Sequence, residues 1–389
     1  MASLNLNPNP LLKPSSFPVG RKKNPLFKSS SFPIGWKKNK SKLNLHKTFS
    51  ITYENCLHTS SFQSKARSKF IIGQFPLSNI RNMNYVVVSI DKENLEPKIL
   101  NRMNKIDTHR NFLPYAASNG LILLLCDNIC GEHLDIPQEA LWNPTTNELK
   151  ILPPSPATLD PRYVKIIRNH FGFAYDSTSN DYKVIRFLGR YDDLSYSLGA
   201  AELYSLKTNS WKGVDFHPST FHPCGNRFMK INANGTYYWL NNVDHNFIQS
   251  FTFATEKFDS YRVPMPPSNM FNGYKFCQKR LVEYRGSLGF LASTSMYVDK
   301  VNYCAFELWV WDAASLSWCL ESEFLVNKMR SFMGLFENDK LFYLQSGGDL
   351  MVQDCATNKA MNLSNAITHE VGRLYPFVEN YVSLSLYGK

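Results

Sequence analysis

The sequence predicts an all-β protein in which repeated antiparallel hairpins pack around a shared core. Six times, an alternating apolar stretch runs into a cluster of Asp, Asn, Ser or Thr residues and continues into a second apolar or aromatic stretch. These clusters follow Trp142, Tyr175, Tyr204, Phe253, Trp311 and Gln353. Aromatic residues make up 14% of the 389 residues, and helical periodicity is scarce. Because one hairpin cannot bury its apolar face alone, several must stack together.

The hairpin turns have a chemical basis in the sequence. Four clusters begin with a short polar side chain that can accept a hydrogen bond from the backbone two residues further on: Asn143, Asp176, Asp312 and Asp354. An aromatic residue follows several turns, as with Trp211, Phe258 and Trp318. Alternation beside a turn places such aromatics in a core, so we expect them to pack on the next sheet.

Further strands precede these hairpins. Residues 83–90 form a β-branched run, and Asn-Gly or Arg-Gly pairs introduce the apolar runs 121–125, 237–240 and 287–291, with 341–344 as a similar run after Asn338-Asp339. The repeating unit is therefore a first strand, a variable segment and a hairpin. Its spacing of about 30 to 58 residues brackets the roughly 40 to 50 of a propeller blade. We predict a β-propeller, with a β-sandwich as the main alternative and six or seven blades both open.

The positive charge lies almost entirely in the N-terminal head. Residues 1–53 contain nine lysines and Arg21 and no acidic residue, so they carry +10 of the net +11. The remaining chain is nearly neutral, which argues against a nucleic-acid-binding domain. No apolar run approaches the roughly 18 residues of a membrane span. We therefore expect neither nucleic acid nor a membrane as a partner.

The head also contains an internal repeat, because residues 9–20 recur as 24–35. It is rich in Pro, Ser and Lys and lacks strand or helix periodicity, so we expect a disordered tail over 1–66 and a folded domain over 67–389. Eight scattered cysteines without a Cys-x-x-Cys pair indicate reduced thiols in the cytoplasm or nucleus. The basic, Ser-rich head also resembles a transit peptide, which makes the chloroplast an alternative.

The ordered motifs resemble the F-box-associated interaction domain of plant F-box/kelch-repeat proteins. The resemblance runs from about Asn119 to the C-terminus and rests on Leu141–Thr146 with Leu152-Pro153-Pro154, on 171–176 with 180–186, on 201–206 with Trp211, on 234–240, on 248–253 with Val263-Pro264, on 308–311 and on 381–384. It implies a kelch-like β-propeller with no catalytic residues and no cofactor.

The same resemblance implies a function. Such proteins are substrate receptors of cullin-RING ubiquitin ligases: an N-terminal F-box binds a Skp-family adaptor, and the propeller holds the target protein. Residues 1–70 show none of the F-box motifs, neither Leu-Pro before an acidic residue nor a Cys-Lys-x-Trp ending. We therefore expect target recognition through this chain, and adaptor and cullin binding only if an F-box lies outside it.

The sequence contains no catalytic motif. A Gly-x-Ser-x-Gly elbow, a phosphate-binding glycine loop and a His-Glu-x-x-His helix are all missing, so we expect no enzyme activity, although a propeller enzyme is an alternative. A kelch-like binding protein unrelated to ubiquitination is a second alternative. The nearest metal-site candidate is His217, His222 and Cys224, but no second Cys pair completes it, so we expect no metal.

Partner binding is expected at loops on one rim of the sheets. The longest predicted insertions are 162–170, 190–197, 217–227 and 270–274. Arginine and aromatic side chains are the types that anchor protein interfaces. The predicted contact residues are therefore Arg162, Tyr163, Arg190, Tyr191, Phe221, Phe271 and Tyr274.

Overall fold

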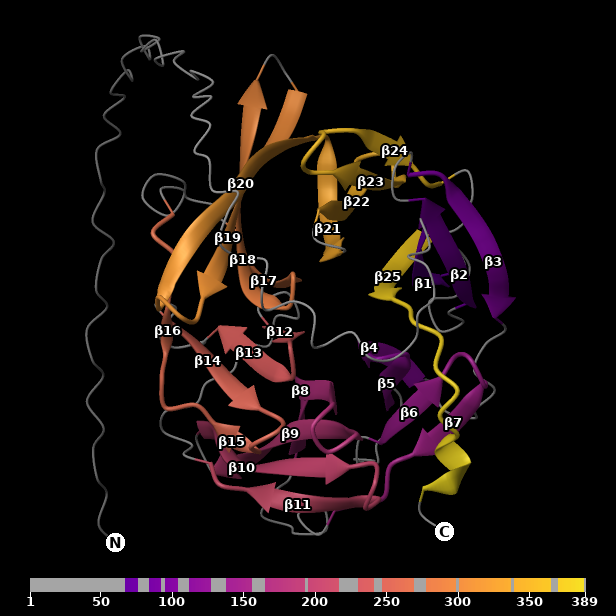
Figure 1. Ribbon diagram of the computed structural model, residues 1–389, viewed down its shortest axis with the longest axis vertical. Helices are drawn as coiled ribbons and strands as arrows, with labels where there is room; N and C mark the ends of the chain where they lie inside the picture. The colour runs from indigo at the N-terminus through magenta and orange to yellow at the C-terminus, as the bar shows by residue number, and fades with distance from the viewer. Residues whose placement is uncertain are drawn as a thin grey trace, which may run out of the picture. The chain divides into compact units, whose positions relative to one another are not determined.

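The computed structural model describes most of the chain beyond residue 66. The described residues are 67–75, 84–91, 95–103, 112–126, 138–155, 165–192, 195–216, 230–240, 247–268, 278–298, 301–336, 339–364 and 370–387, all within the compact unit Gln63–Lys389. They form six antiparallel sheets and one short 3-10 helix (Figure 1). The all-β prediction is confirmed for this part of the chain, whereas the predicted tail over 1–66 lies outside it.

Five of the sheets are built from strands that are consecutive in the sequence. Blade 2 contains β4 (Phe112–Ser118), β5 (Leu121–Cys126), β6 (Glu139–Asn143) and β7 (Glu148–Ile151). Blade 3 contains β8 (Lys165–Asp176), β9 (Asp181–Asp192), β10 (Ser195–Ser205) and β11 (Ser210–Val214). Blade 4 contains β12 (Lys230–Ala233), β13 (Thr236–Leu240) and β14 (Phe247–Thr252), with both β15 (Lys257–Phe258) and β16 (Val263–Pro264) paired to β14.

Blade 5 contains β17 (Gln278–Tyr284), β18 (Ser287–Val298), β19 (Val301–Asp312) and β20 (Ser317–Asn327). Blade 6 contains β21 (Met329–Phe336), β22 (Lys340–Gln345), β23 (Leu350–Asp354) and β24 (Ala360–Asn362). In each of these five blades the first strand lies innermost and the last lies at the outer edge.

Blade 1 joins the two ends of the folded region. Its strand order is β25 (Glu370–Pro376), β1 (Arg67–Phe75), β2 (Asn84–Asp91) and β3 (Pro97–Met103). The C-terminal strand β25 therefore takes the inner position and pairs with β1, with Phe70 opposite Pro376. The inner strands contact one another in a closed cycle, β4 to β8, β12, β17, β21, β25 and back to β4. The six sheets thus form a closed six-bladed β-propeller, which confirms the propeller prediction and excludes the sandwich.

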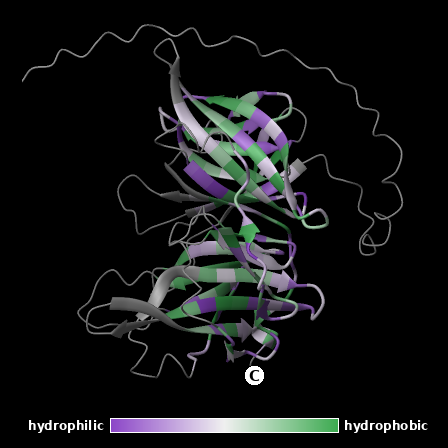
Figure 2. Ribbon diagram, turned by 90° about the vertical axis from the view of Figure 1, so that its left-hand side faces the viewer, coloured by the Kyte–Doolittle hydropathy of each residue, from purple (hydrophilic) through white to green (hydrophobic). Residues whose placement is uncertain are grey.

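Six apolar clusters hold the ring together, one between each pair of neighbouring blades. Leu123 of blade 2 and Phe173 of blade 3 share one cluster, for example, and Phe70 of blade 1 and Phe342 of blade 6 share another. The other four clusters follow the same rule around the ring. Figure 2 shows apolar residues along the strands and hydrophilic residues gathered at many of the turns. Each blade thus buries its faces against its two neighbours.

The predicted hairpin turns form as expected. All six carry a left-handed residue four positions after the first residue of the turn: Asn147, Asn180, Asn209, Glu256, Leu316 and Asn358. Side-chain oxygens of Asn143, Asp176 and Asp312 accept backbone N–H bonds from the residue two positions on, at 2.9, 3.0 and 2.9 Å. These bonds satisfy the turn amides, so a four-residue connection reverses the chain without losing hydrogen bonds.

The aromatics after the turns also pack as expected. The indole of Trp211 donates from Nε1 to the carbonyl oxygen of Pro153 at 2.8 Å, and Trp318 makes the same bond to Pro264 at 2.7 Å. In both cases a tryptophan on the outer strand of one blade contacts a proline segment of the preceding blade. The same tryptophan–proline hydrogen bond thus joins two different pairs of neighbouring blades.

A buried charge cluster joins blades 2 and 3. The Arg186 guanidinium donates to Glu139 at 3.0 Å and Glu202 at 2.9 Å, and to Ser155 Oγ at 2.6 Å. The same guanidinium lies 3.8 Å from the centroid of a Trp211 ring. Burial raises the pKa of Glu139, although Arg186 opposes this shift. One cation is thus shared by two carboxylates inside the ring.

The last described residues, 377–387, cross blade 2. Asn380 donates to the carbonyl oxygen of Asn119 at 2.6 Å, and Asn143 donates to the carbonyl oxygen of Val382 at 2.7 Å. Glu148 accepts bonds from Ser383 Oγ and from the backbone N–H of Leu384, each at 2.8 Å. Leu384, in the 3-10 helix Leu384–Leu386, is buried in the cluster between blades 2 and 3. These contacts hold the C-terminal segment against blade 2.

Within the part of the chain that the structure describes, no helix is long and apolar enough to cross a membrane. The four described cysteines, Cys126, Cys304, Cys319 and Cys355, are free thiols.

Candidate protein-binding site

The connections on the two faces of the propeller differ in length. Turns between first and second strands and between third and fourth strands have two to five residues, as at Asn119-Gly120 and 313–316. The connections on the opposite face include 127–138, 152–164, 215–229 and 265–277. Because neighbouring strands are antiparallel, all of these longer connections leave from strand ends on the same face. Three of the four predicted insertions, 162–170, 217–227 and 270–274, fall within or beside them.

Most of the predicted contact residues lie outside the described part of the chain. These are Arg162, Tyr163, Phe221, Phe271 and Tyr274. Arg190 and Tyr191 are not in a loop as expected, because they belong to β9 and lie opposite Ser197 and Tyr196 of β10. The two strands extend until only residues 193 and 194 connect them, so the predicted insertion 190–197 is mostly sheet. Similarly, 165–170 is part of β8.

The metal candidate His217, His222 and Cys224 also lies outside the described residues. Among those described, no group of three His, Cys, Asp or Glu side chains is arranged to hold a metal ion.

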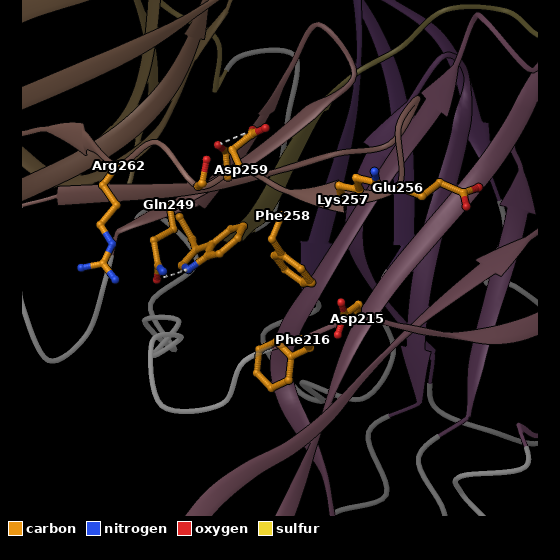
Figure 3. Close-up of a pocket in the computed structure, with 11 residues that line it drawn as sticks. Asp215, Phe216, Gln249, Glu256, Lys257, Phe258, Asp259 and Arg262 are labelled. Atoms are coloured by element: carbon orange, nitrogen blue, oxygen red, sulfur yellow. Dashed lines mark hydrogen bonds between the residues drawn. The ribbon is translucent and has the colours of Figure 1, made fainter.

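A pocket of about 450 Å³ opens between the outer strands of blades 3 and 4 (Figure 3). Asp215 and Phe216, which follow β11, form one side of it. Blade 4 supplies the other side with residues of β13 and β14 and of the broken outer strand: Trp239, Gln249, Ser250, Glu256, Lys257, Phe258, Asp259, Ser260 and Arg262. The volume lies in the range typical of small-molecule and side-chain pockets.

Aromatic rings form the apolar part of this pocket. The ring of Phe258 lies 5.7 Å from that of Phe216 and 6.1 Å from that of Trp239, measured between centroids. Phe187 of β9 lies 6.1 Å from Phe258. These rings also belong to the cluster that joins blades 3 and 4. The apolar wall of the pocket is therefore continuous with the core between blades 3 and 4.

Polar groups surround the rings at fixed positions. Asp259 accepts hydrogen bonds from Ser250 Oγ at 2.7 Å and Thr252 Oγ1 at 3.3 Å. Gln249 Oε1 accepts the Trp239 indole N–H at 3.3 Å, and the Arg262 guanidinium lies 4.5 Å from the Phe247 ring centroid. Figure 3 shows Gln249 and Arg262 to the left of Phe258, and Asp215 and Phe216 below it.

Glu256 lines the blade 4 side of the pocket and forms an ion pair with Lys183 at 3.0 Å and a second, closer pair with Lys212. Burial acts to raise the pKa of Glu256, but hydrogen bonds from Lys212 and Lys183 outweigh it and leave the pKa below its ordinary value. Glu256 is therefore ionised at neutral pH, and its charge is neutralised by the two lysines.

The lining of the pocket combines aromatic and polar side chains. Its described part contains Ser250, whose hydroxyl donates to Asp259, and no histidine, cysteine or tyrosine. Aromatic walls with a guanidinium, an amide and carboxylates at the rim can hold a side chain that has an apolar body and a polar tip.

Sequence reasoning missed this pocket. The sequence predicts that Phe258 packs on the next sheet, and the structure confirms this because the residue packs against the cluster between blades 3 and 4. Gln249, Asp259 and Arg262 belong to no sequence motif. The signal in the sequence is the stretch 257–264, where polar residues and Pro264 interrupt an outer strand. That interruption splits the strand into β15 and β16, each of two residues, and leaves the space between the blades open.

The comparisons with known proteins agree with the fold. The family model of the F-box associated beta propeller domain matches residues 75–381. F-box protein CPR1 of Arabidopsis thaliana is 28% identical over 173 residues, which cover 40% of this chain and 40% of the relative. F-box/WD-40 repeat-containing protein 1 of the same plant is 28% identical over 148 residues, covering 34% of this chain and 33% of the relative. These aligned segments thus span two fifths or less of each relative's length.

Among solved structures, oligogalacturonate lyase of Vibrio parahaemolyticus matches with a TM-score of 0.38 at 7% identity, covering 75% of this chain and 78% of the lyase. The Dos1 propeller matches with a TM-score of 0.32 at 11% identity, covering 77% of this chain and 67% of that one. Neither likeness is strong enough to indicate a shared activity.

The closed ring, the long connections on one face and the pocket between blades 3 and 4 define a propeller-type binding domain. More specifically, the chain belongs to the F-box associated beta propeller family, whose model covers it from residue 75 to residue 381.

Proposed function

We propose that this chain is the non-catalytic target-binding part of a ubiquitin-ligase substrate receptor. The family match over residues 75–381 carries this proposal, because domains of this family occur in F-box proteins such as the Arabidopsis relatives. The target would bind on the face that bears the long connections and insert a side chain into the pocket between blades 3 and 4. The blades would follow a kelch-like arrangement.

Binding of the ligase adaptor would require a different part of the protein from binding of the target. A Skp-family adaptor and a cullin would join only through an F-box, and the propeller itself offers the target site. We place the protein in the cytoplasm or nucleus, where the ligase components act, with the chloroplast as the alternative for a cleaved basic head. N-terminal sequencing of the mature chain separates the two: cleavage near residue 50 would contradict the first.

The proposal is tested by affinity capture of the full chain, tagged at its C-terminus and expressed in plant cells. We expect a specific protein to be captured and to accumulate when the proteasome is inhibited. Arg262→Glu should abolish its capture, because it reverses the charge at the pocket rim. Lys359→Glu, an exposed charge reversal on blade 6, is the matched control and should retain the partner.

The outcomes separate two errors. If no protein is captured above a tag-only control, the receptor role is wrong. If a partner is captured equally by the wild type, Arg262→Glu and Lys359→Glu, the receptor role stands and the pocket assignment is wrong. Alanine at both Arg190 and Tyr191 tests the remaining sequence prediction, because unchanged capture would remove these two residues from the contact surface.

A propeller enzyme is the rival from another class. The described pocket lining holds no histidine or cysteine, and its serine donates to Asp259 rather than to an imidazole. Turnover of an oligosaccharide or ester by the purified chain would contradict the proposal.

A further inference from the structure

The outer edge of blade 5 differs from the other outer edges in length. β20 has 11 residues, whereas β3 has seven, β11 has five, β7 four and β24 three. Among the described strands, β20 pairs only with β19, so one side of it has no strand partner, although the Leu325 carbonyl oxygen accepts a hydrogen bond from Gln353 Nε2 of blade 6 at 3.0 Å. Figure 1 shows β20 on the outer side of the ring. A long unpaired edge is a template for another strand.

Blade 4 covers only part of the face of β20 that is turned toward it. The outer strand of blade 4 is broken into β15 and β16, each with only two residues. It is therefore much shorter than the strand beside it. Two apolar side chains of β20 remain open to solvent as a result: Leu320 is 46% exposed and Leu325 is 50% exposed.

A bulge divides β20 into two parts. Leu308 lies opposite Ser322 and Trp309 lies opposite Leu320, so Glu321 is the extra residue. Its carboxylate accepts a hydrogen bond from Tyr284 Oη at 3.1 Å and pairs with Arg285 at 3.3 Å. The bulge is thus fixed to the inner part of the blade, and a regular strand begins after it.

The regular part runs from Ser322 to Asn327 and alternates strictly. Phe324 and Val326 are buried in the cluster between blades 5 and 6, and Phe324 stacks on Phe306 at 5.0 Å between ring centroids. Glu323, Leu325 and Asn327 are exposed. Because its buried face cannot turn outward, the register of this strand is fixed and its free edge is preorganised.

The charge on β20 selects the occupant. Its sequence contains Glu321 and Glu323 and no lysine or arginine. Glu323 has no ion-pair or hydrogen-bond partner among the described residues. A second copy of the chain would bring another edge with two glutamates and no basic residue, so it offers no group of opposite charge to Glu323. A strand with basic residues would instead complement the edge.

We propose that the edge of β20 from Ser322 to Asn327 binds an extended segment of another protein in which basic residues alternate with apolar ones. The segment adds a fifth strand to blade 5. Main-chain hydrogen bonds supply the attraction, an apolar side chain lies beside Leu325, and a lysine or arginine lies beside Glu323. This edge is distinct from the pocket between blades 3 and 4, and its function does not depend on the ligase role.

The test uses two short dye-labelled peptides and the full chain. One peptide alternates valine with lysine, and the other alternates valine with glutamate. Fluorescence anisotropy measures their binding. The chain has a net charge of +11, so non-specific attraction favours the glutamate peptide. Tighter binding of the lysine peptide would therefore indicate binding at the acidic edge of β20 and not attraction to the net charge of the chain.

Three variants locate the site. Glu323→Lys and Leu325→Lys should each weaken the lysine peptide about tenfold, since each places like charges side by side. Ile151→Lys is the matched control, because Ile151 is also an exposed apolar residue on an outer strand, β7 of blade 2. It should leave binding unchanged. Circular dichroism verifies that all three variants are folded.

The proposal is overturned by any of three results: the glutamate peptide binds as tightly as the lysine peptide, neither peptide binds, or Ile151→Lys weakens binding as much as Leu325→Lys. Sedimentation of the wild type tests the rival occupant. A concentration-dependent dimer that Leu325→Lys dissociates would show that a second copy occupies the edge instead.

Discussion

Leu316 occupies a backbone position that its side chain does not favour. Its φ is 50°, and four of the five equivalent positions in the other hairpins hold asparagine, which tolerates the left-handed region. Leu316 is also 55% exposed, so it gains little from burial. The turn between β19 and β20 therefore stores strain that the other turns largely avoid.

Replacing Leu316 with asparagine should stabilise the fold by about 1 kcal/mol, because asparagine lowers the penalty of the left-handed conformation. Chemical denaturation measures the change. Leu316→Ala is the control: it removes the exposed apolar group but keeps the backbone penalty, so it should show no such gain. Equal effects of the two substitutions would contradict the strain argument.

The shared guanidinium of Arg186 gives the second prediction at this scale. Arg186→Met leaves Glu139 and Glu202 buried without their cation and should reduce the free energy of unfolding by about 3–5 kcal/mol. Thermal and urea denaturation check this value. A loss below about 1 kcal/mol would show that the cluster adapts to the missing charge.

Glu139 makes the wild-type stability depend on pH. Its pKa is raised in the fold by burial, so the folded protein holds that proton more tightly than the unfolded chain does. The resulting stability is fully present below the unfolded pKa and is lost as pH rises through the folded pKa. Glu139→Gln should flatten this part of the stability profile, measured by urea denaturation over a range of pH. An unchanged profile in Glu139→Gln would rule out this source.

At the scale of single elements, Gly120 shows how a turn and a distant segment constrain each other. Its φ is 83°, and a Cβ placed there would lie 2.5 Å from both the Cβ of Asn380 and the carbonyl oxygen of Val378. Gly235 occupies the same position in the Asn-Gly turn of blade 4, with φ at 73°, but a Cβ there would meet open space. The two glycines differ only in what lies above them.

Gly120→Ala should therefore destabilise the protein by about 1–3 kcal/mol more than Gly235→Ala, because only the first must displace the C-terminal segment. Both substitutions carry the same backbone penalty, which cancels in the comparison. Paired urea denaturation curves measure the difference. Equal losses would mean that residues 377–387 move aside without cost.

The elements that the sequence predicted well are those with a local cause. A polar turn cluster followed by an aromatic residue determines a hairpin from within a few residues, and all six predicted hairpins form. The lengths of strands are different, because they depend on partners far along the chain. Arg190 and Tyr191 read as a loop, yet pairing with Ser197 and Tyr196 extends the sheet through them.

The pocket and the edge of β20 were hard to predict for the same reason. Both arise where the short outer strand of blade 4 meets a longer neighbour, and the interrupted stretch 257–264 shows the break in that strand but not the lengths of the strands beside it. Likewise, the Arg186 cluster joins residues from two blades that share no spacing in the sequence. The sequence left six or seven blades open, because the number of blades is determined by contacts between inner strands that are far apart in the chain.

At the scale of the whole molecule, closure depends on β25. A chain ending at residue 364 lacks this strand and the segment that crosses blade 2, so β1 loses its inner partner and Leu374 leaves the cluster between blades 1 and 6. We expect this truncation to lose cooperative unfolding and to become sensitive to protease.

A chain ending at Tyr387 is the control for that truncation. It keeps β25, the buried Leu384 and Tyr387, which packs against the cluster between blades 2 and 3, so it should unfold like the wild type. Limited proteolysis and thermal denaturation compare the two. A cooperative, protease-resistant chain ending at residue 364 would show that the ring does not need its closing strand.

The pairing of β1 with β25 has a consequence for synthesis in the cell. As the ribosome makes the chain, β1 emerges early but waits for a partner that is translated some three hundred residues later. Until then the nascent protein is an open arc with one apolar blade face uncovered at each end. When β25 is added, the arc closes and both apolar faces are buried. Only unfinished chains therefore present these faces to chaperones and proteases.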